Sequence, residues 1–247
     1  MGGGKHSCPQ RYSSRLAICL LADSVNVVDQ ASNVSPVSVL RRAGPQRFRK
    51  ALICGVGRSG TTAVASVLAE LGFNLGEHPV DPLREDTHLR ELLLRRDADQ
   101  LITELEAWSR RHAAVAWKDP KIHSAVTPAF MASLPADWLI LAVFRDPLAI
   151  TQRRMDVTGV PLMTTLRDVS RFQQKLLNFI DASAQTVALI SYERFMAQTP
   201  ASVQALQELV ATAGGPPDPH LVAERARQHQ RRYLDSIHPT GAPRSTT

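Results

Sequence analysis

Hydrophobic residues gather in short blocks from about residue 50 onward, and these blocks predict buried strands. Continuous apolar runs cover residues 51–56, 138–144 and 186–190, and residues 115–118 form a shorter candidate. Apolar runs of this length are typical of strands that are covered on both faces, as in a parallel sheet.

Between these runs, apolar residues recur at spacings of three and four, which predicts amphipathic helices. The helices expected in this way cover residues 61–71, 85–96, 98–111, 147–154, 162–182, 201–213 and 221–234. Strands that alternate with helices favour an α/β fold. We therefore expect a three-layer domain with a mostly parallel central sheet and helices on both faces.

The chain is predicted to hold one such domain, since 247 residues suffice for a single core of ordinary size. Residues 1–48 are rich in Gly, Ser, Gln and Arg and end in a turn-like Ala-Gly-Pro. We interpret this segment as a poorly ordered N-terminal leader. The α/β domain is then expected over residues 49–236, and a flexible tail over residues 237–247.

Composition narrows the function classes. The net charge of +6 suits an anionic ligand, although arginines spread over helices are equally typical of a solvated basic surface. Because the sequence has no long basic block, we do not expect a nucleic-acid partner. The apolar stretch at residues 16–22 is too short to span a bilayer, so stable membrane insertion is not expected.

Three cysteines, Cys8, Cys19 and Cys54, are widely spaced and form no CxxC pair. This spacing indicates neither a disulfide framework nor a zinc site, which fits a reducing cytoplasm.

The sharpest motif is Gly55-Val56-Gly57-Arg58-Ser59-Gly60-Thr61-Thr62, between a predicted strand and a predicted helix. Glycines let backbone N–H groups approach an anion, and a helix N-terminus adds unpaired donors and positive potential. Thr61 and Thr62 add hydroxyl groups, and Arg58 adds a forked cation. The motif therefore predicts a phosphate-binding loop of the kind found in P-loop NTPase-like folds, with a plain connecting turn as the alternative.

A Walker loop for ATP or GTP has the pattern G-x-x-x-x-G-K, with lysine directly after its second glycine. Gly60 corresponds to that glycine here, and Thr61 follows it instead of lysine. A P-loop kinase or related phosphotransferase is therefore the second hypothesis rather than the first. A non-catalytic nucleotide-binding relative is the third.

Arg58-Ser59-Gly60-Thr61-Thr62 resembles the 5′-phosphosulfate loop of sulfotransferases that use 3′-phosphoadenosine 5′-phosphosulfate (PAPS). Phe144-Arg145-Asp146-Pro147 resembles the 3′-phosphate motif of the same family, and Trp117–Lys121 and Ser191–Glu193 resemble further segments of bacterial-type members. The resemblance implies that PAPS is the co-substrate and that no metal is required. It also implies a nucleotide site formed by Gly57, Arg58, Ser59, Gly60, Thr61, Thr62 and Arg145.

The sequence departs from this family at one position of the second motif. The family usually has serine eight residues after the arginine, and Arg153 stands there, with Thr151 nearby. Arg153 would bind the 3′-phosphate through a charge-assisted fork in place of the serine. The alternative is an eroded site.

The resemblance also directs attention to groups that would act at the sulfur. Lys118, at the end of a short strand, is expected to stabilise the sulfuryl oxygens, and Arg58 is expected to lie near the bridging oxygen. For the base that takes the acceptor's proton, Glu85 ranks before His88, since both would share one helix face. Glu77 and Asp86 rank behind them, and each has an ordinary surface role as the alternative.

The acceptor is not identified by the sequence. A small molecule, a lipid and a carbohydrate all stay open, and the oligomeric state is not indicated. His123 is interpreted as structural. The Arg-rich stretch of Arg225, Arg227, Arg231 and Arg232 is interpreted first as an exposed helix face and second as a contributor to the 3′-phosphate site.

Overall fold

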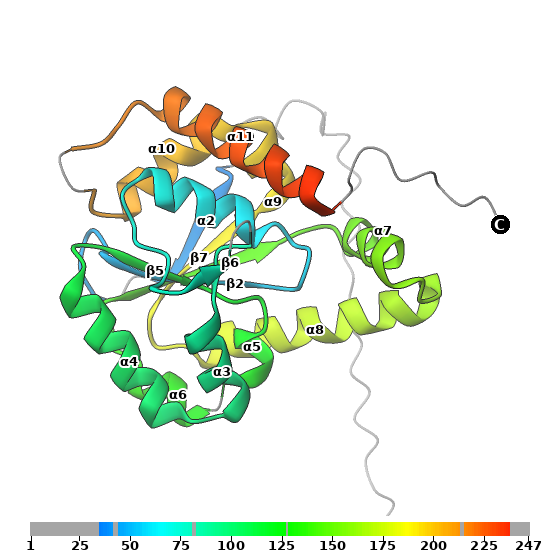
Figure 1. The fold of residues 1–247 in the computed structure, drawn as a ribbon, viewed down its shortest axis with the longest axis horizontal. Coiled ribbons are helices and arrows are strands. Elements are labelled where there is room, and N and C mark those ends of the chain that lie inside the picture. The colour runs from blue at the N-terminus through cyan, green and yellow to red at the C-terminus, as the bar shows by residue number, and fades with distance from the viewer. Residues whose placement is uncertain (1–34, 42–43, 81–82, 127, 213–214, 238–247) are drawn as a thin grey trace, which may run out of the picture. The chain divides into compact units, whose positions relative to one another are not determined.

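The computed structural model describes residues 35–41, 44–80, 83–126, 128–212 and 215–237, and contains a five-stranded sheet at its centre (Figure 1). The strand order is β1-β7-β6-β2-β5. The strands are β1 (Val37–Arg41), β2 (Lys50–Gly55), β5 (Val115–Lys118), β6 (Trp138–Phe144) and β7 (Thr186–Ser191). Four of them run parallel, and β1 lies antiparallel on the β7 edge. The predicted α/β class and mostly parallel sheet are confirmed.

Strand β2 shows why the apolar runs have no polar alternation. Its side chains point in turn to opposite faces of the sheet. Ala51 and Ile53 pack into the core on one face, and Leu52 and Cys54 pack into the core on the other. All four are fully buried, so each of these four positions must be apolar.

Helices cover both faces and complete the three layers (Figure 1). One face is covered by α2 (Thr61–Glu70), α9 (Tyr192–Ala197), α10 (Thr199–Leu209) and α11 (Pro219–Ile237). The other is covered by α3 (Thr87–Arg95), α4 (Ala98–Arg111), α5 (Ile122–Ala125), α6 (Pro128–Ser133) and most of α8 (Leu162–Ala182). Helix α7 (Pro147–Thr158) forms a hairpin with the start of α8, at one side of the sheet.

The structure differs from the sequence-based expectations at several boundaries. Strand β1 comes from the segment 1–48 that we interpreted as a leader, so the sheet includes residues before 49. The leader residues 1–34 and the tail residues 238–247 lie outside the described part of the chain. Helix α7 continues to Thr158, past the predicted end at residue 154. The short helices α5, α6 and α9 were not expected, because four to six residues give too little periodicity to recognise.

The helix predicted over residues 85–96 begins two residues later than expected. Glu85 and Asp86 form β4, a two-residue strand that pairs with β3 (Pro79–Val80). The Asp86 carboxylate then accepts a hydrogen bond of 2.9 Å from the Leu89 amide, which makes Asp86 the N-cap of α3. Glu85 therefore does not lie on the helix.

Among the described helices, none is both long enough and apolar enough to cross a membrane.

The order of the parallel strands determines which loops lie together. It places the residues after β7, β6, β2 and β5 in a row along the carboxyl edge of the sheet. Open α/β sheets bind their ligands at this edge.

Candidate functional site

The glycine loop after β2 is a tight turn with two residues in the left-handed region. The Ser59 amide donates a 2.8 Å hydrogen bond to the Val56 carbonyl oxygen, and Gly60 has a φ of 99°. Arg58 has a φ of 76°, which is uncommon for a residue with a side chain. Such strained backbone is concentrated at functional sites, where the surroundings fix it. Gly60 is the N-cap residue of α2, so the loop leads directly into a helix N-terminus.

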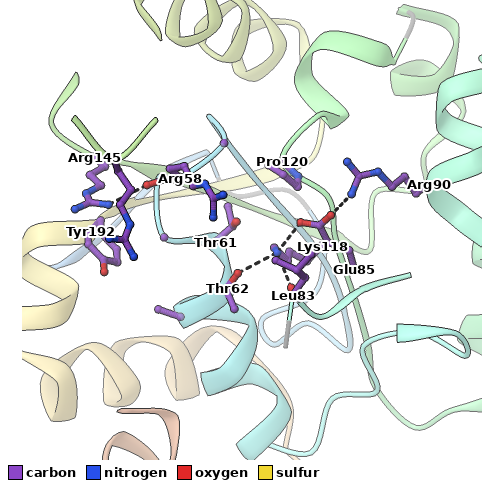
Figure 2. Close-up of a pocket in the computed structure, with 14 residues that line it drawn as sticks. Arg58, Thr61, Thr62, Leu83, Glu85, Arg90, Lys118, Pro120, Arg145 and Tyr192 are labelled. Carbon is purple, nitrogen blue, oxygen red and sulfur yellow. Dashed lines mark hydrogen bonds and ion pairs between the residues drawn. The ribbon is translucent and has the colours of Figure 1, made fainter. Parts of the chain in front are cut away.

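A cavity of about 270 Å³ lies over this loop (Figure 2). Its walls come from the glycine loop, from the ends of three other strands, and from the loop before α3. The lining residues are Gly57, Arg58, Gly60, Thr61, Thr62, Ala63, Leu83, Glu85, Arg90, Lys118, Pro120, Arg145, Arg153 and Tyr192. Five of these side chains are cationic and one is a carboxylate, so the cavity favours an anion.

Arg145 forms one side of the cavity. One of its Nη atoms donates a 3.0 Å hydrogen bond to the backbone carbonyl oxygen of Arg58. Its guanidinium also lies over the ring of Tyr192, 4.8 Å from the ring centroid. The Glu193 carboxylate lies 3.9 Å from Nε of Arg145 and accepts a hydrogen bond from the Asp146 amide. Arg145 is thus oriented by residues that follow β2 and β7.

Two donors on this side are buried and have no hydrogen-bond partner among the described residues. They are Nε of Arg145 and one Nη of Arg153. Both arginines also line the cavity, so this side presents two guanidinium groups to an anion. The buried hydroxyl of Thr151, two residues before Arg153 on α7, also lacks a partner within the described residues.

Lys118 forms the opposite side and is 2% exposed. Its Nζ donates to Thr62 Oγ1 at 3.0 Å, to the Leu83 carbonyl oxygen at 2.6 Å, and to Glu85 Oε1 at 2.9 Å. An ammonium group has three donors, so all three are used. Burial lowers the pKa of Lys118, and the Glu85 carboxylate opposes that shift. The expectation that Lys118 itself holds the sulfuryl oxygens does not fit this geometry.

Glu85 connects Lys118 to Arg90, a residue of α3. The second carboxylate oxygen of Glu85 accepts a hydrogen bond from Arg90, whose Nε lies 3.8 Å from Asp119 Oδ2. Asp119 is fully buried, and burial is the first cause of its raised pKa. Figure 2 shows this network on one side of Thr61 and Thr62, with Arg145 and Tyr192 on the other side.

The remaining candidate bases lie elsewhere. His88 is exposed and lines a separate cavity of about 200 Å³, together with Glu77 and Asp86. The interpretation that Glu85 and His88 face one cleft is therefore wrong, because α3 begins only at Thr87. Asp86 is buried and accepts hydrogen bonds from the amides of His78 and Leu89. Glu77 pairs with Arg111 and His112, and the hydrogen bond from Arg111 is the main cause of its lowered pKa.

The Arg-rich helix α11 packs on α2 and α10 rather than lining the cavity. Arg227 donates a 2.9 Å hydrogen bond to Thr199, and Arg225 lies 3.6 Å from Glu70. The interpretation of these arginines as an exposed helix face fits this position.

The structure thus brings together the predicted residues Gly57, Arg58, Gly60, Thr61, Thr62, Glu85, Lys118, Arg145 and Arg153. Ser59 lies in the same loop with its hydroxyl buried. Arg90 was missed by sequence reasoning, and no local pattern indicates it. Tyr192 lies in the segment Ser191–Glu193 that carries part of the family resemblance, but no role was predicted for it.

Within the described ranges, no group of three or more His, Cys, Asp or Glu residues is placed to hold a metal ion.

Comparison with known proteins gives distant structural matches. No family model and no curated protein matches the chain. A retinol dehydratase solved with androsterone and the inactive cofactor PAP is 12% identical, with a TM-score of 0.35 over 74% of this chain. A retinol dehydratase solved with retinol and PAP is 13% identical, with a TM-score of 0.37 over 73% of this chain.

The chain covers 65% of each of those proteins, which is less than two thirds of their length. Similarity at this level does not identify the reaction, so the cavity itself is the basis for assigning one.

Proposed function

We propose that the chain is a sulfotransferase that uses PAPS as co-substrate and moves a sulfuryl group to a hydroxyl or amine of an acceptor. One observation carries the proposal. Arg58 and Arg145 follow the neighbouring parallel strands β2 and β6, and both line one cationic cavity. Two arginines that follow neighbouring strands and line one cavity are suited to a ligand with two separate anionic groups, and the sequence resemblance suggests PAPS as that ligand.

The glycine loop would hold the phosphosulfate end. The backbone N–H groups at the start of α2, the hydroxyls of Thr61 and Thr62, and the Arg58 guanidinium all border the cavity there. When bound, PAPS supplies the sulfuryl group that is transferred. Positive charge and positioning are what such an in-line transfer needs from the protein.

Arg145 and Arg153 would hold the 3′-phosphate. Both arginines line the cavity. Arginine binds phosphate as a fork of two charge-assisted hydrogen bonds. The arginine at position 153 would then replace the family's serine productively.

Lys118 is assigned a positioning role. Its Nζ donates a hydrogen bond to Thr62 Oγ1, so the Thr62 hydroxyl acts as an acceptor toward Lys118. The hydroxyl hydrogen of Thr62 would then be available to donate to a ligand in the cavity that Thr62 borders. Lys118 also fixes Glu85 beside the same cavity. Glu85 is the lining carboxylate, so we assign it as the group that accepts the acceptor's proton.

Calorimetric titration with 3′,5′-ADP, 5′-AMP and ATP plus Mg²⁺ tests the proposal. We expect 3′,5′-ADP to bind at least about tenfold more tightly than 5′-AMP, since a charge-assisted hydrogen bond is worth about 1.5–3 kcal/mol. Equal affinities would overturn the 3′-phosphate assignment, and a preference for ATP would favour a phosphotransferase.

A second measurement tests the transfer. The chain is incubated with ³⁵S-labelled PAPS and a panel of phenols, sterols, sugars and amines, and radioactive products are separated. We expect a labelled acceptor that is not formed by the Glu85→Gln variant. Tight PAPS binding with no labelled product from the panel would support a non-catalytic nucleotide-binding role instead.

A further inference from the structure

The hairpin between α7 and α8 has an ordered turn. Helix α7 ends at Thr158, and Gly159 closes it with a φ of 68° and a 2.9 Å hydrogen bond from its amide to the Met155 carbonyl oxygen. Pro161 caps the start of α8, and its carbonyl oxygen accepts a 3.0 Å hydrogen bond from the Thr165 amide. The tip of the hairpin is thus fixed by its own backbone.

This tip exposes large apolar side chains. Nine such side chains are exposed in the described part of the chain, and four of them fall within seven residues at the tip. Their exposed fractions are 51% for Val157, 38% for Val160, 44% for Leu162 and 55% for Met163. Scattered exposed apolar residues are ordinary, but a concentration of them on one protrusion marks an interaction site.

Basic residues lie behind the tip, further along both helices. Residues 157–166 contain no charged residue, whereas 148–175 contain five basic and two acidic residues. The cations Arg154, Arg171 and Lys175 lie 5.7–5.8 Å from the centroid of the Phe172 ring. Phe172 packs in turn against a small cluster with Val56 and Val169, which anchors this part of the hairpin beside the glycine loop.

We propose that this hairpin tip docks on the surface of a lipid bilayer that contains anionic lipids. An apolar tip with basic residues behind it on both helices matches the acyl boundary and the negative head groups at the same time. Figure 1 shows the α7–α8 hairpin extending past the edge of the central sheet, so its end can meet a broad surface. A convex tip of this kind needs no complementary pocket, in contrast to docking on a folded protein.

Docking would bring the cationic cavity close to the membrane. Arg153 lines that cavity, and Val157 follows it by one turn of α7, a rise of about 6 Å. Membrane binding by the tip does not depend on the proposed sulfotransferase reaction.

Vesicle flotation tests the proposal with the full chain. The vesicles are phosphatidylcholine alone or phosphatidylcholine with about one third phosphatidylserine. We expect binding to the anionic vesicles that weakens on removal of phosphatidylserine. The double variant Leu162→Ser, Met163→Ser should weaken binding at least about tenfold, because apolar burial at the interface is lost. Arg171→Gln should weaken it about fivefold.

Matched variants control for exposure and fold. Leu94→Ser with Leu221→Ser alters two apolar residues that are 54% and 44% exposed on α3 and α11. Arg95→Gln alters a cation that pairs with a carboxylate on its own helix, as Arg171 does. Both controls should float like the unmodified chain.

The proposal is overturned if the chain does not bind anionic vesicles, or if the control variants lose binding as much as the tip variants do. Self-association that the tip substitutions abolish, without vesicle binding, would assign the tip to a second copy of the chain.

Discussion

The guanidinium of Arg145 donates a 3.0 Å hydrogen bond to the backbone carbonyl oxygen of Arg58. The two residues are 87 positions apart in the chain, and the parallel pairing of β2 with β6 brings them together. The bond joins a residue in a strained left-handed conformation to the neighbouring strand end. The hydrogen bond therefore fixes the position of Arg145 relative to the glycine loop.

Replacing Arg145 should weaken binding of the 3′-phosphate and leave binding of the 5′-phosphate nearly unchanged. We expect Arg145→Gln to weaken binding of 3′,5′-ADP by about 2 kcal/mol, or about thirtyfold, because a forked ionic contact with phosphate is lost. Binding of 5′-AMP should change by less than about threefold. The matched control is Arg154→Gln, which removes a nearby α7 cation that packs on Phe172. An equal loss for both nucleotides in calorimetry would show that Arg145 supports the loop rather than the 3′-phosphate.

The buried pair of Lys118 and Glu85 should contribute strongly to stability. Removing one partner of a buried ion pair costs about 3–5 kcal/mol, and the lower end applies to Lys118 because Arg90 stays beside Glu85 as a second cation. Lys118→Met should therefore lower the free energy of unfolding in urea by about 3 kcal/mol. The double variant Lys118→Met, Glu85→Gln should recover part of that loss.

Lys121→Met serves as the control, since Lys121 is exposed three residues further on. If Lys118→Met proves no more destabilising than Lys121→Met, the network does not hold the site as described.

The parts of the site that could be predicted are those encoded locally. The run Ala51–Val56 and the glycines after it indicate a strand, a tight turn and a helix start from adjacent residues alone. Arg145 could be found in the same way, because it directly follows a second apolar run. The parallel sheet then follows from the alternation of strands and helices.

The role of Lys118 could not be predicted, because it depends on contacts between distant segments. Its three acceptors come from α2, from the loop before β4 and from β4 itself. The error over Glu85 and His88 has a local cause. A helix start shifted by two residues moves Glu85 off the helix and onto the cavity wall, while His88 stays on the solvent side. Helix boundaries are the least certain part of a periodic pattern, and here the pairing of β3 with β4 decides them.

Gly60 should not tolerate a side chain. A methyl group there would overlap the ring of Tyr192, and the φ of 99° already disfavours any residue except glycine. We expect Gly60→Ala to lower the free energy of unfolding by about 3 kcal/mol and to abolish measurable binding of 3′,5′-ADP. Gly159→Ala is the control, because its φ is 68° and no atom lies within 4 Å of the added methyl group.

The control substitution should cost only about 1 kcal/mol, the cost of the backbone conformation. In a Tyr192→Ala background, Gly60→Ala should cost less than it does in the unmodified chain. Equal costs in the two backgrounds would mean that the overlap with Tyr192 does not limit the loop.

His123 should make the fold sensitive to mild acid. The imidazole is 7% exposed, and burial lowers its pKa from 6.5 to about 4, helped by the nearby charge of Lys175 and opposed by the Pro120 backbone. Between these two pH values the unfolded chain binds a proton that the folded chain does not. The free energy of unfolding is therefore unaffected by this group above pH 6.5, and it decreases as the pH falls toward 4.

The loss amounts to about 3 kcal/mol, at about 1.4 kcal/mol for each unit of pKa difference. It can be measured by comparing urea unfolding of the unmodified chain and of His123→Phe between about pH 7 and about pH 4. The aromatic replacement keeps a ring beside Phe172, where the His123 ring makes an edge contact at 6.2 Å. Between about pH 7 and about pH 4, the free energy of unfolding of His123→Phe should therefore fall by about 3 kcal/mol less than that of the unmodified chain.

The control is His88→Gln, which changes an exposed imidazole. Its free energy of unfolding should depend on pH as in the unmodified chain, because the substitution leaves His123 buried. Parallel slopes for the unmodified chain and His123→Phe would place the acid sensitivity on other groups.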